Sequence, residues 1–206
     1  MSDVSRKAHW EGVYTTKGER EVSWFQENPA PSLELIALAG LSAGAAIIDI
    51  GGGASRLVDA LIERKIGQIT VLDLSAAALD AAKGRLGDMG GDVEWVVADV
   101  TTWKPSKTYD LWHDRAAFHF LTDASDRSAY VGHLKSAVRS GGHVILGTFA
   151  LDGPERCSGL PIMRYDSGML GAVLGAEFDL IDSRRHDHTT PWGAVQRFQF
   201  STFRRI

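Results

Sequence analysis

The sequence of 206 residues contains only one cysteine, Cys157, so the chain cannot form an internal disulfide. This excludes a disulfide-stapled secreted scaffold. The sequence also has no run of about 18 apolar residues, the length that a membrane helix needs. Residues 1–17 lack the apolar core of a signal peptide. We therefore expect a cytoplasmic protein that does not interact with a membrane.

Positive charge is not in excess either. The sequence has 22 Lys and Arg residues against 26 Asp and Glu residues, a net charge of −4. Nucleic-acid backbones attract proteins through clustered Lys and Arg side chains, so we expect a small-molecule or protein substrate and no nucleic acid. Hydrophobic residues make up 44% of the chain, and 6 Trp, 8 Phe and 4 Tyr are present, which excludes a disordered chain.

Between residues 45 and 149, strand-like runs alternate with helix-like stretches. The apolar or β-branched runs predict strands at 45–50, 69–72, 93–97, 109–113 and 143–148. Helices are expected after Leu57, after Ser75 as an N-cap, and at residues 125–138. This alternation predicts right-handed crossovers and a parallel sheet that is covered by helices on both faces.

The last part of the sequence has a different pattern. Residues 177–183 and 195–203 resemble two strands, and no helix-length segment separates them. They should therefore pair as an antiparallel hairpin. The predicted fold class is α/β: a doubly wound, mostly parallel, seven-stranded, Rossmann-like sheet with a C-terminal antiparallel hairpin. This differs from the ordinary dinucleotide-binding topology.

Three consecutive glycines, Gly51 to Gly53, follow the first predicted strand and precede a helix. Glycines at this place allow a tight turn and a close approach of a ligand to the backbone. A dinucleotide site requires another glycine three positions after Gly53, but that position holds Arg56. A glycine-rich turn without any ligand is an alternative that the motif alone leaves open.

The pattern Asp-Ile-Gly-Gly-Gly at residues 49–53 resembles the first motif of class I S-adenosylmethionine-dependent methyltransferases. The resemblance implies S-adenosyl-L-methionine as the cofactor and S-adenosyl-L-homocysteine as the product. It also implies that Asp49 binds the amino group of the cofactor and that Gly51 and Gly53 border its methionine and ribose portions. The sequence departs from the family at Ser55, where a third glycine is common, and we expect a slightly altered turn there.

Acidic residues also end the next two predicted strands. A carboxylate at Asp73 can accept hydrogen bonds from both hydroxyls of a ribose. By the resemblance, Asp99 meets the amino group of adenine, and an acceptor carboxylate suits that donor. Leu74 and Val100, which follow these residues, are assigned to the same cofactor site. Each acidic residue taken alone is equally typical of a helix N-cap.

The fourth motif of the family falls at residues 109–120. The pair Asp114 and Arg115 resembles the thiopurine-type and protein-lysine-type branches, which implies that Asp114 faces the transferring methyl group and that Arg115 contacts the cofactor. His113 and His119 can accept a substrate proton near neutral pH. The alternatives are a structural ion pair between Asp114 and Arg115 and packing or solvent roles for both histidines. We predict Asp114 and His119 as catalytic residues.

Aromatic residues near the N-terminus carry a second resemblance. Trp10, Tyr14 and Trp24 look like the aromatic lead-in of small methyltransferases related to eukaryotic protein-lysine methyltransferases, where such residues help to enclose S-adenosylmethionine. Aromatic faces attract a sulfonium cation and shield it from water. Trp10 and Tyr14 share one face of a helix. We expect residues 1–28 to form a lid over the cofactor; the alternative is a helix that buries its aromatic face on the core.

The loop at residues 152–161 follows the fifth predicted strand, at the edge where open α/β sheets bind ligands. We expect it to contact the substrate, within a C-terminal part (150–206) that also holds the hairpin. Cys157 has no evident catalytic partner, and methyl transfer needs no covalent intermediate. His186 and His188 lack the Cys or carboxylate spacing of a zinc site, so we expect no metal.

These features predict a single methyltransferase domain over residues 1–206, with 45–149 as the cofactor-binding core. A nitrogen, oxygen or sulfur atom of the substrate would attack the methyl group of the sulfonium directly. The first alternative is a cofactor-binding module without catalysis that acts as a partner or sensor. The second is an NAD-dependent oxidoreductase, which Arg56 and the terminal hairpin oppose.

Overall fold

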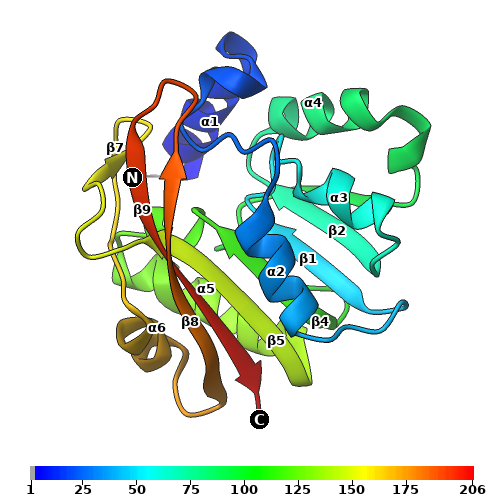
Figure 1. Cartoon of the computed structure of the whole chain (residues 1–206), viewed down its shortest axis with the longest axis vertical. Coiled ribbons are helices and arrows are strands. Elements are labelled where there is room, and N and C mark those ends of the chain that lie inside the picture. The colour runs from blue at the N-terminus through cyan, green and yellow to red at the C-terminus, as the bar shows by residue number, and fades with distance from the viewer. Residues whose placement is uncertain (1–2) are drawn as a thin grey trace.

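A sheet runs through the middle of the molecule, with the strand order β3-β2-β1-β4-β5-β9-β8 (Figure 1). The computed structural model describes residues 3–206. In sheet order, the strands are β3 (Glu94–Val97), β2 (Gln68–Asp73), β1 (Ala46–Ile50), β4 (Tyr109–Arg115), β5 (Val138–Phe149), β9 (Val195–Arg205) and β8 (Phe178–Thr189). Neighbours from β3 to β5 are parallel, whereas β9 is antiparallel to both β5 and β8. The predicted fold class is confirmed.

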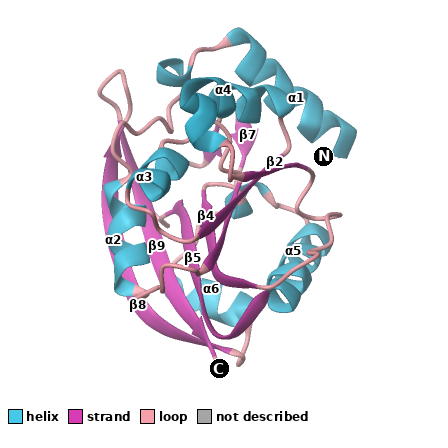
Figure 2. Ribbon diagram, turned by 90° about the vertical axis from the view of Figure 1, so that its right-hand side faces the viewer, coloured by secondary structure: helices cyan, strands magenta, loops and turns pink. Residues whose placement is uncertain are grey.

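Helices cover both faces of this sheet (Figure 2). They are α1 (Asp3–Thr16), α2 (Ala30–Leu38), α3 (Leu57–Glu63), α4 (Ala76–Leu86), α5 (Ala124–Ala137) and α6 (Ser167–Leu174). Shorter elements lie in the connections: the 3₁₀ turns η1 (Glu19–Glu21), η2 (Gly87–Gly90) and η3 (Phe118–Phe120), and a small hairpin of β6 (Arg156–Cys157) and β7 (Leu160–Pro161).

The core consists of two layers, one on each face of the sheet. Successive strand residues point to opposite faces. Ile47 of β1 accordingly packs into a cluster with residues of α2, α3 and α4, whereas Ile48 packs into a cluster with residues of α5 and α6. Both side chains are fully buried. A run that is apolar on both faces forms a strand of this kind because a parallel sheet is covered on both sides.

Most predicted boundaries agree with the structure to within a few residues. Ser75 caps α4, because its hydroxyl accepts a hydrogen bond of 3.1 Å from the backbone N–H of Ala78. The hairpin is longer than predicted, because β8 extends to Thr189. Helix α6 has no counterpart among the predicted elements, although Asp166 caps it by accepting a 2.8 Å hydrogen bond from the backbone N–H of Met169.

The carboxyl ends of β1 and β4 meet at the point where the strand order reverses, which is where open α/β sheets bind ligands. The N-terminal segment (residues 3–28) crosses the molecule at this edge, and its helix α1 lies beside α4 (Figures 1 and 2). Residues 1 and 2 of the predicted lid lie outside the described residues. The fold therefore places the aromatic N-terminal segment next to the edge of the sheet that carries the motifs.

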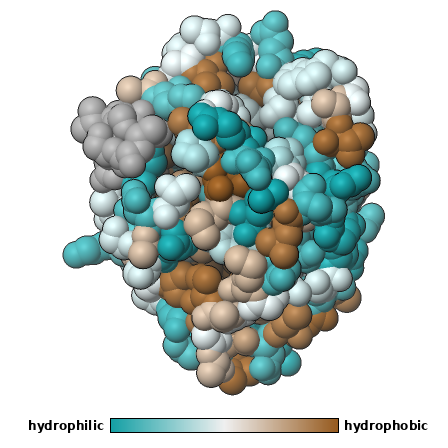
Figure 3. All heavy atoms as spheres, turned by 90° about the vertical axis from the view of Figure 1, so that its left-hand side faces the viewer, coloured by the Kyte–Doolittle hydropathy of each residue, from teal (hydrophilic) through white to brown (hydrophobic). Residues whose placement is uncertain are grey.

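The outer surface mixes polar and apolar side chains. On the face shown in Figure 3, hydrophobic residues lie in separate groups among hydrophilic ones. Large exposed hydrophobic residues come from several elements, among them Leu38 in α2, Met169 in α6 and Trp192 in the β8–β9 turn. Exposed apolar residues scattered in this way are normal for a protein surface. Within residues 3–206, no helix has both the length and the apolar character needed to cross a membrane.

Candidate cofactor and active site

A cavity lies at the carboxyl edge of the sheet, between the loops that follow β1 to β4 and the N-terminal segment. The cavity has a volume of about 100 Å³. The predicted site residues that line it are Trp10, Tyr14, Trp24, Gly51, Asp73, Leu74, Asp99, Val100 and Arg115. Residues that are far apart in the sequence thus share one cavity.

The other two predicted cofactor residues lie beside this cavity. Asp49 lines a smaller adjoining pocket together with Arg115. Gly53 has a φ angle of +47°, and a Cβ atom at this position would lie 3.0 Å from Oδ2 of Asp73 and 3.0 Å from Oη of Tyr14. Glycine adopts this backbone conformation without steric cost and leaves room for both neighbours. The glycine loop (residues 51–53) therefore passes between the N-terminal segment and β2.

Asp73 ends β2 and is 8% exposed. Its Oδ1 accepts a 2.8 Å hydrogen bond from the backbone N–H of Ser75. Burial raises the pKa of this carboxyl to about 7, and the nearby charges of Asp49 and Glu11 contribute to the increase. A ligand that donates hydrogen bonds to the ionised carboxylate would offset the cost of burial. Asp73 is therefore suited to hold a pair of ribose hydroxyls.

Asp99 follows β3 and already has several partners. Its Oδ1 accepts hydrogen bonds from the backbone N–H of Thr101 at 2.8 Å and from the hydroxyl of Thr101 at 2.6 Å, and its Oδ2 lies 3.0 Å from Nη2 of Arg6. Arg6 also pairs with Asp126 of α5. Asp99 thus both lines the cavity and ties α1 to the sheet.

The three predicted aromatic residues lie together at the cavity. The ring of Trp10 is 5.5 Å from that of Trp24 and 5.0 Å from that of Phe120, both in edge-to-face geometry. The indole N–H of Trp24 donates a 3.1 Å hydrogen bond to Oη of Tyr14. Burial raises the pKa of Tyr14, so its hydroxyl stays protonated near neutral pH. These rings form an apolar wall that excludes water from one side of the cavity.

Arg115 is the cation of the cavity wall. Its Nη2 donates a 2.8 Å hydrogen bond to the backbone oxygen of Trp24, whereas its buried Nη1 has no hydrogen-bond partner among the described residues. Burial lowers the pKa of this guanidinium. A buried donor without a partner is costly, so it favours a ligand with an acceptor such as a carboxylate. The donor at Arg115, the acceptor at Asp73 and the aromatic wall together fit a nucleoside that carries an amino-acid group.

Asp114, a predicted catalytic residue, is fully buried and is not among the residues that line the cavity. Its Oδ2 accepts a 2.7 Å hydrogen bond from the hydroxyl of Tyr130, and its carboxylate also accepts bonds from the backbone N–H groups of Ala117 and Phe118. Burial raises the pKa of Asp114 to about 6. The carboxylate holds the start of η3, which forms part of the cavity wall. Its catalytic role stays a prediction.

His119, the other predicted catalytic residue, is also fully buried and outside the lining. Its ring lies 4.5 Å from that of Phe120 and 5.0 Å from that of Phe149, and neither ring nitrogen has a hydrogen-bond partner within residues 3–206. Burial lowers the pKa of His119 to about 3, and the charge of Arg115 acts in the same direction. The imidazole is therefore neutral at physiological pH. Its catalytic role likewise stays a prediction.

The cavity also contains residues that were not predicted, notably Arg6, Phe120 and Cys157. Arg6 lies four residues before Trp10, which in turn lies four before Tyr14, so the helical spacing could have identified it. Cys157 comes from the predicted substrate loop, and burial raises the pKa of its thiol to about 12. A thiol with this pKa is a poor nucleophile at neutral pH.

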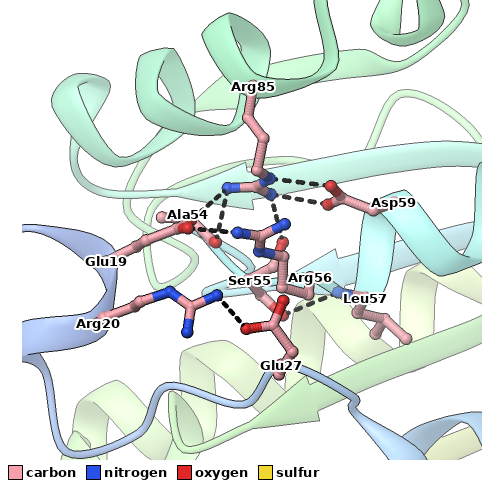
Figure 4. Close-up of polar contacts among 9 residues, drawn as sticks. All are labelled: Glu19, Arg20, Glu27, Ala54, Ser55, Arg56, Leu57, Asp59 and Arg85. Atoms are coloured by element: carbon pink, nitrogen blue, oxygen red, sulfur yellow. Dashed lines mark hydrogen bonds and ion pairs between the residues drawn. The ribbon is translucent and has the colours of Figure 1, made fainter.

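A second polar network ties the N-terminal segment to the glycine loop (Figure 4). Glu19 of η1 pairs with Arg56 and with Nη1 of Arg85 at 2.9 Å. Arg85 also pairs with Asp59 at 2.7 Å and donates a 3.0 Å hydrogen bond to the backbone oxygen of Ser55. Arg56, which occupies the position of a dinucleotide-site glycine, thus anchors the N-terminal segment instead. Within residues 3–206, no group of three His, Cys, Asp or Glu side chains is arranged to hold a metal ion.

Comparison with known proteins identifies related sequences. Residues 47–142 match a family model described as a methyltransferase domain. Malonyl-[acyl-carrier protein] O-methyltransferase 1 of Ilyobacter polytropus is 31% identical over 104 residues, which are 50% of this chain and 37% of that protein. Trans-aconitate 2-methyltransferase of Paracidovorax citrulli is 30% identical over 119 residues, 56% of this chain and 43% of that protein. The chain thus spans less than half the length of these relatives.

Solved structures share the fold. The N-methyltransferase NodS of Bradyrhizobium japonicum, determined with S-adenosyl-L-homocysteine, superposes with a TM-score of 0.71 at 15% identity over 99% of both chains. The 1,6-didemethyltoxoflavin-N1-methyltransferase of Burkholderia thailandensis superposes with a TM-score of 0.68 at 20% identity over 98% of this chain and 84% of that one. The chain thus contains a match to a methyltransferase domain over residues 47–142, and its strand order and overall structure are those of the class I S-adenosylmethionine-dependent methyltransferase fold.

Proposed function

We propose that this chain transfers a methyl group from S-adenosylmethionine to a small molecule that binds in the cavity. The observation that carries the proposal is the shared lining: Asp73 and Asp99 at the strand ends face the same space as the aromatic side chains of the N-terminal segment. When bound, the cofactor supplies a methyl group on a sulfonium centre. The chain's own residues would bind, orient and dehydrate the two reactants.

Each part of the cavity has a proposed role in binding. Asp73 would accept hydrogen bonds from the ribose hydroxyls, and Leu74 and Val100 would contact the adenine, with Asp99 close by. Trp10, Tyr14 and Trp24 would cover the sulfonium and exclude water. Gly51 and Gly53 would let the ligand approach the backbone. Alignment of the nucleophile with the methyl group would supply most of the rate acceleration, up to about 7–11 kcal/mol for well-oriented reactants.

A small acceptor suits the enclosure of the cavity. The N-terminal segment covers it from one side, and the loop that carries Cys157 contributes to its wall. Nε2 of His9 in α1 lies 3.3 Å from the hydroxyl oxygen of Ser158 in that loop. The two segments therefore meet beside the cavity. Relatives named for trans-aconitate and for 1,6-didemethyltoxoflavin also take small molecules. The cytoplasm stays the predicted compartment.

Direct displacement needs no covalent intermediate, and a base is required only if the acceptor must lose a proton. Asp114 and His119 remain the predicted candidates for this role. Because both are buried outside the cavity lining, the variants Asp114→Asn and His119→Phe test the prediction by their kcat. A catalytic residue lowers kcat with little change in stability, whereas a supporting residue lowers stability first.

The experiment is turnover with S-adenosylmethionine and acceptors of different chemistry. Formation of S-adenosylhomocysteine would be followed with a carboxylate (trans-aconitate), an amine (tryptamine) and a thiol (thiophenol), each with a blank that lacks the acceptor. Acceptor-dependent formation supports the proposal. If S-adenosylhomocysteine binds but a wide acceptor panel gives no turnover, the cofactor-binding module without catalysis becomes the better description.

A further inference from the structure

Three buried polar side chains form a hydrogen-bonded chain beside the cavity. Nδ1 of His113 lies 2.7 Å from Oδ1 of Asp49, and Nε2 of His113 lies 2.8 Å from Oγ of Ser32. Ser32, His113 and Asp49 are 1%, 2% and 4% exposed. Buried polar groups are costly unless their hydrogen bonds are made, so this chain must hold a defined geometry. The roles proposed above require neither His113 nor Ser32.

The sheet itself brings this chain together. Asp49 of β1 and His113 of β4 are register partners on adjacent parallel strands, so their side chains extend from the same face. The previous pair on that face, Ile47 and Leu111, is apolar and belongs to the core. Ser32 is contributed by the first turn of α2. Polar residues therefore replace the apolar pair only at the strand ends, where the ligand cavity begins.

The chain fixes one oxygen of Asp49 and leaves the other near the glycine loop. Because a carboxylate only accepts, Nδ1–H of His113 donates to Oδ1, and the other ring nitrogen, Nε2, pairs with the hydroxyl of Ser32. A Cβ atom at Gly52 would lie 2.6 Å from Oδ2 of Asp49. Asp49 shares its small pocket with Arg115, whose Nη1 has no partner within residues 3–206. A carboxylate and a guanidinium in one pocket match the amino and carboxylate groups of an amino acid.

We propose that His113 and Ser32 are positioning residues that hold the Asp49 carboxylate in the orientation that binds the amino group of the cofactor. This inference rests on the proposed function. Asp49 and Arg115 attract each other. Without the bond from His113, the carboxylate would turn toward the guanidinium, and the two groups would satisfy each other instead of the ligand. Fixing Asp49 in advance removes this reorganisation from the cost of binding.

A Ser-His-Asp chain is also the catalytic arrangement of serine hydrolases. In those enzymes the serine hydroxyl must be open to an acyl substrate. Here Ser32 is 1% exposed on the far side of the imidazole, packed in the first turn of α2. Ser32 and Asp49 both line the small pocket that also contains Arg115, but it is the Asp49 carboxylate that comes closest to the glycine loop, with Oδ2 2.6 Å from the position of a Cβ atom at Gly52. The geometry therefore favours positioning over nucleophilic catalysis.

The test compares two ligands that differ only at the end of the molecule that Asp49 would bind. S-adenosylhomocysteine carries the amino-acid group, and 5′-methylthioadenosine lacks it. Calorimetric titration would use the wild type, His113→Leu, which removes the donor to Asp49, and Ser32→Ala, which releases the far end of the chain. His113→Asn is the matched control, because its amide N–H can replace Nδ1–H. Asp49→Ala serves as the reference for complete loss of the carboxylate.

We expect His113→Leu to weaken S-adenosylhomocysteine binding by about 10-fold to 100-fold, the effect of a lost bond to a charged group. Its affinity for 5′-methylthioadenosine should be unchanged. Ser32→Ala should show a smaller loss of the same selectivity, and His113→Asn should retain most of the wild-type preference. In the Asp49→Ala background, His113→Leu should have no further effect on S-adenosylhomocysteine, because it acts through Asp49.

Equal weakening of both ligands by the folded variants would overturn the inference, because a merely structural role affects the whole site. Full affinity for S-adenosylhomocysteine in His113→Leu would also overturn it. If His113→Leu does not fold, the ligand selectivity of Ser32→Ala and His113→Asn decides between a positioning role and a merely structural role. Failure of the wild type to bind either ligand would instead contradict the proposed function.

Discussion

The N-terminal segment and the seven-stranded sheet keep their positions by different interactions. The sheet is held by fully buried apolar side chains on both faces, such as Ile47 and Ile48 of β1. The segment makes several polar contacts, Arg6 to Asp99 and Asp126, Glu11 to Ser75 and Ala77, and Glu19 to Arg56 and Arg85. It also buries the smaller apolar side chains of Val13 and Val22. Trp24 adds an apolar contact with the core.

This difference has an energetic consequence. Burial of a large apolar side chain contributes about 1.5–3 kcal/mol, and a core of such residues unfolds only as a whole. The pair of Arg6 with Asp99 is buried, whereas the pairs of Glu19 are partly exposed. Partly exposed pairs contribute about 1 kcal/mol or less each, and salt screens them. The segment should therefore open while the sheet stays folded. We propose that it acts as a lid that closes over the bound cofactor.

The largest expected effect is a loss of stability that leaves ligand binding nearly unchanged. Leu111→Ala removes a fully buried side chain from the central strand β4 and should lower the free energy of unfolding by about 2–5 kcal/mol. Urea unfolding measures this loss. The folded variant should still bind S-adenosylhomocysteine with nearly wild-type affinity, because Leu111 packs into the core rather than the cavity. A loss below about 1 kcal/mol would contradict the description of the core.

Asp73→Ala should weaken ligand binding and leave stability almost unchanged, the opposite of what is expected for Leu111→Ala. Loss of the proposed hydrogen bonds to the ribose should weaken cofactor binding by about 1.5–3 kcal/mol with little change in folding. Calorimetric titration of S-adenosylhomocysteine measures the change. Unchanged affinity in a folded Asp73→Ala protein would remove this residue from the site.

The same carboxyl should make binding depend on pH. Burial raises the pKa of Asp73 to about 7 in the ligand-free protein, and the ribose hydroxyls donate to the ionised form. Affinity should therefore rise as pH increases through 7, by about 10-fold between pH 6 and pH 8. Asp73→Asn should bind more weakly than the wild type and show a flatter profile. A wild-type affinity that falls with increasing pH would mean that the protonated carboxyl binds the ligand.

A smaller effect is expected at the contact between α1 and α4. The hydroxyl of Ser75 donates a 2.8 Å hydrogen bond to Oε2 of Glu11, at the N-terminus of α4 where a negative charge is favourable. Glu11→Ala should favour opening of the segment by about 1 kcal/mol, or about fivefold faster amide exchange in α1. Glu11→Gln keeps an acceptor and should have a weaker effect. Equal exchange in all three proteins would mean that this contact does not hold the segment.

The smallest effect is expected for Arg20→Ala. Arg20 pairs with Glu27, and both side chains are more than half exposed. Removing this pair should change neither exchange in α1 nor cofactor affinity beyond about 0.5 kcal/mol. A larger change would show that exposed charges contribute more to the position of the segment than the buried contacts do.

The sheet could be predicted from the sequence because each strand has a local pattern. The apolar runs, the N-cap Ser75 and the glycines after β1 act within a few residues of one another, and the predicted parallel sheet followed from the alternation of strand-like and helix-like segments. The cavity lining was predictable for the same reason at the strand ends Asp73 and Asp99. Helix α6 (Ser167–Leu174) was not predicted, although the N-cap Asp166 is a local signal for it.

Contacts between distant elements could not be predicted in this way. The bond from His113 to Asp49 depends on the register of two strands that are 64 residues apart. The burial of Asp114 and His119 depends on how η3 folds back after β4, which the sequence pattern of the motif does not specify. The pairing of Arg56 with Glu19 requires the N-terminal segment to lie over the glycine loop.

Hydrogen exchange with and without ligand tests the central claim most directly, because it reports cofactor binding and closure of the segment together. S-adenosylhomocysteine should slow amide exchange in residues 5–28 and in the glycine loop, while exchange in the β8–β9 hairpin should stay unchanged. NAD at the same concentration should leave all of these regions unaffected. If residues 5–28 exchange equally slowly with and without saturating S-adenosylhomocysteine, the segment is a permanent part of the core and the lid proposal is wrong. If NAD protects the glycine loop as well as S-adenosylhomocysteine does, the proposed cofactor specificity is wrong.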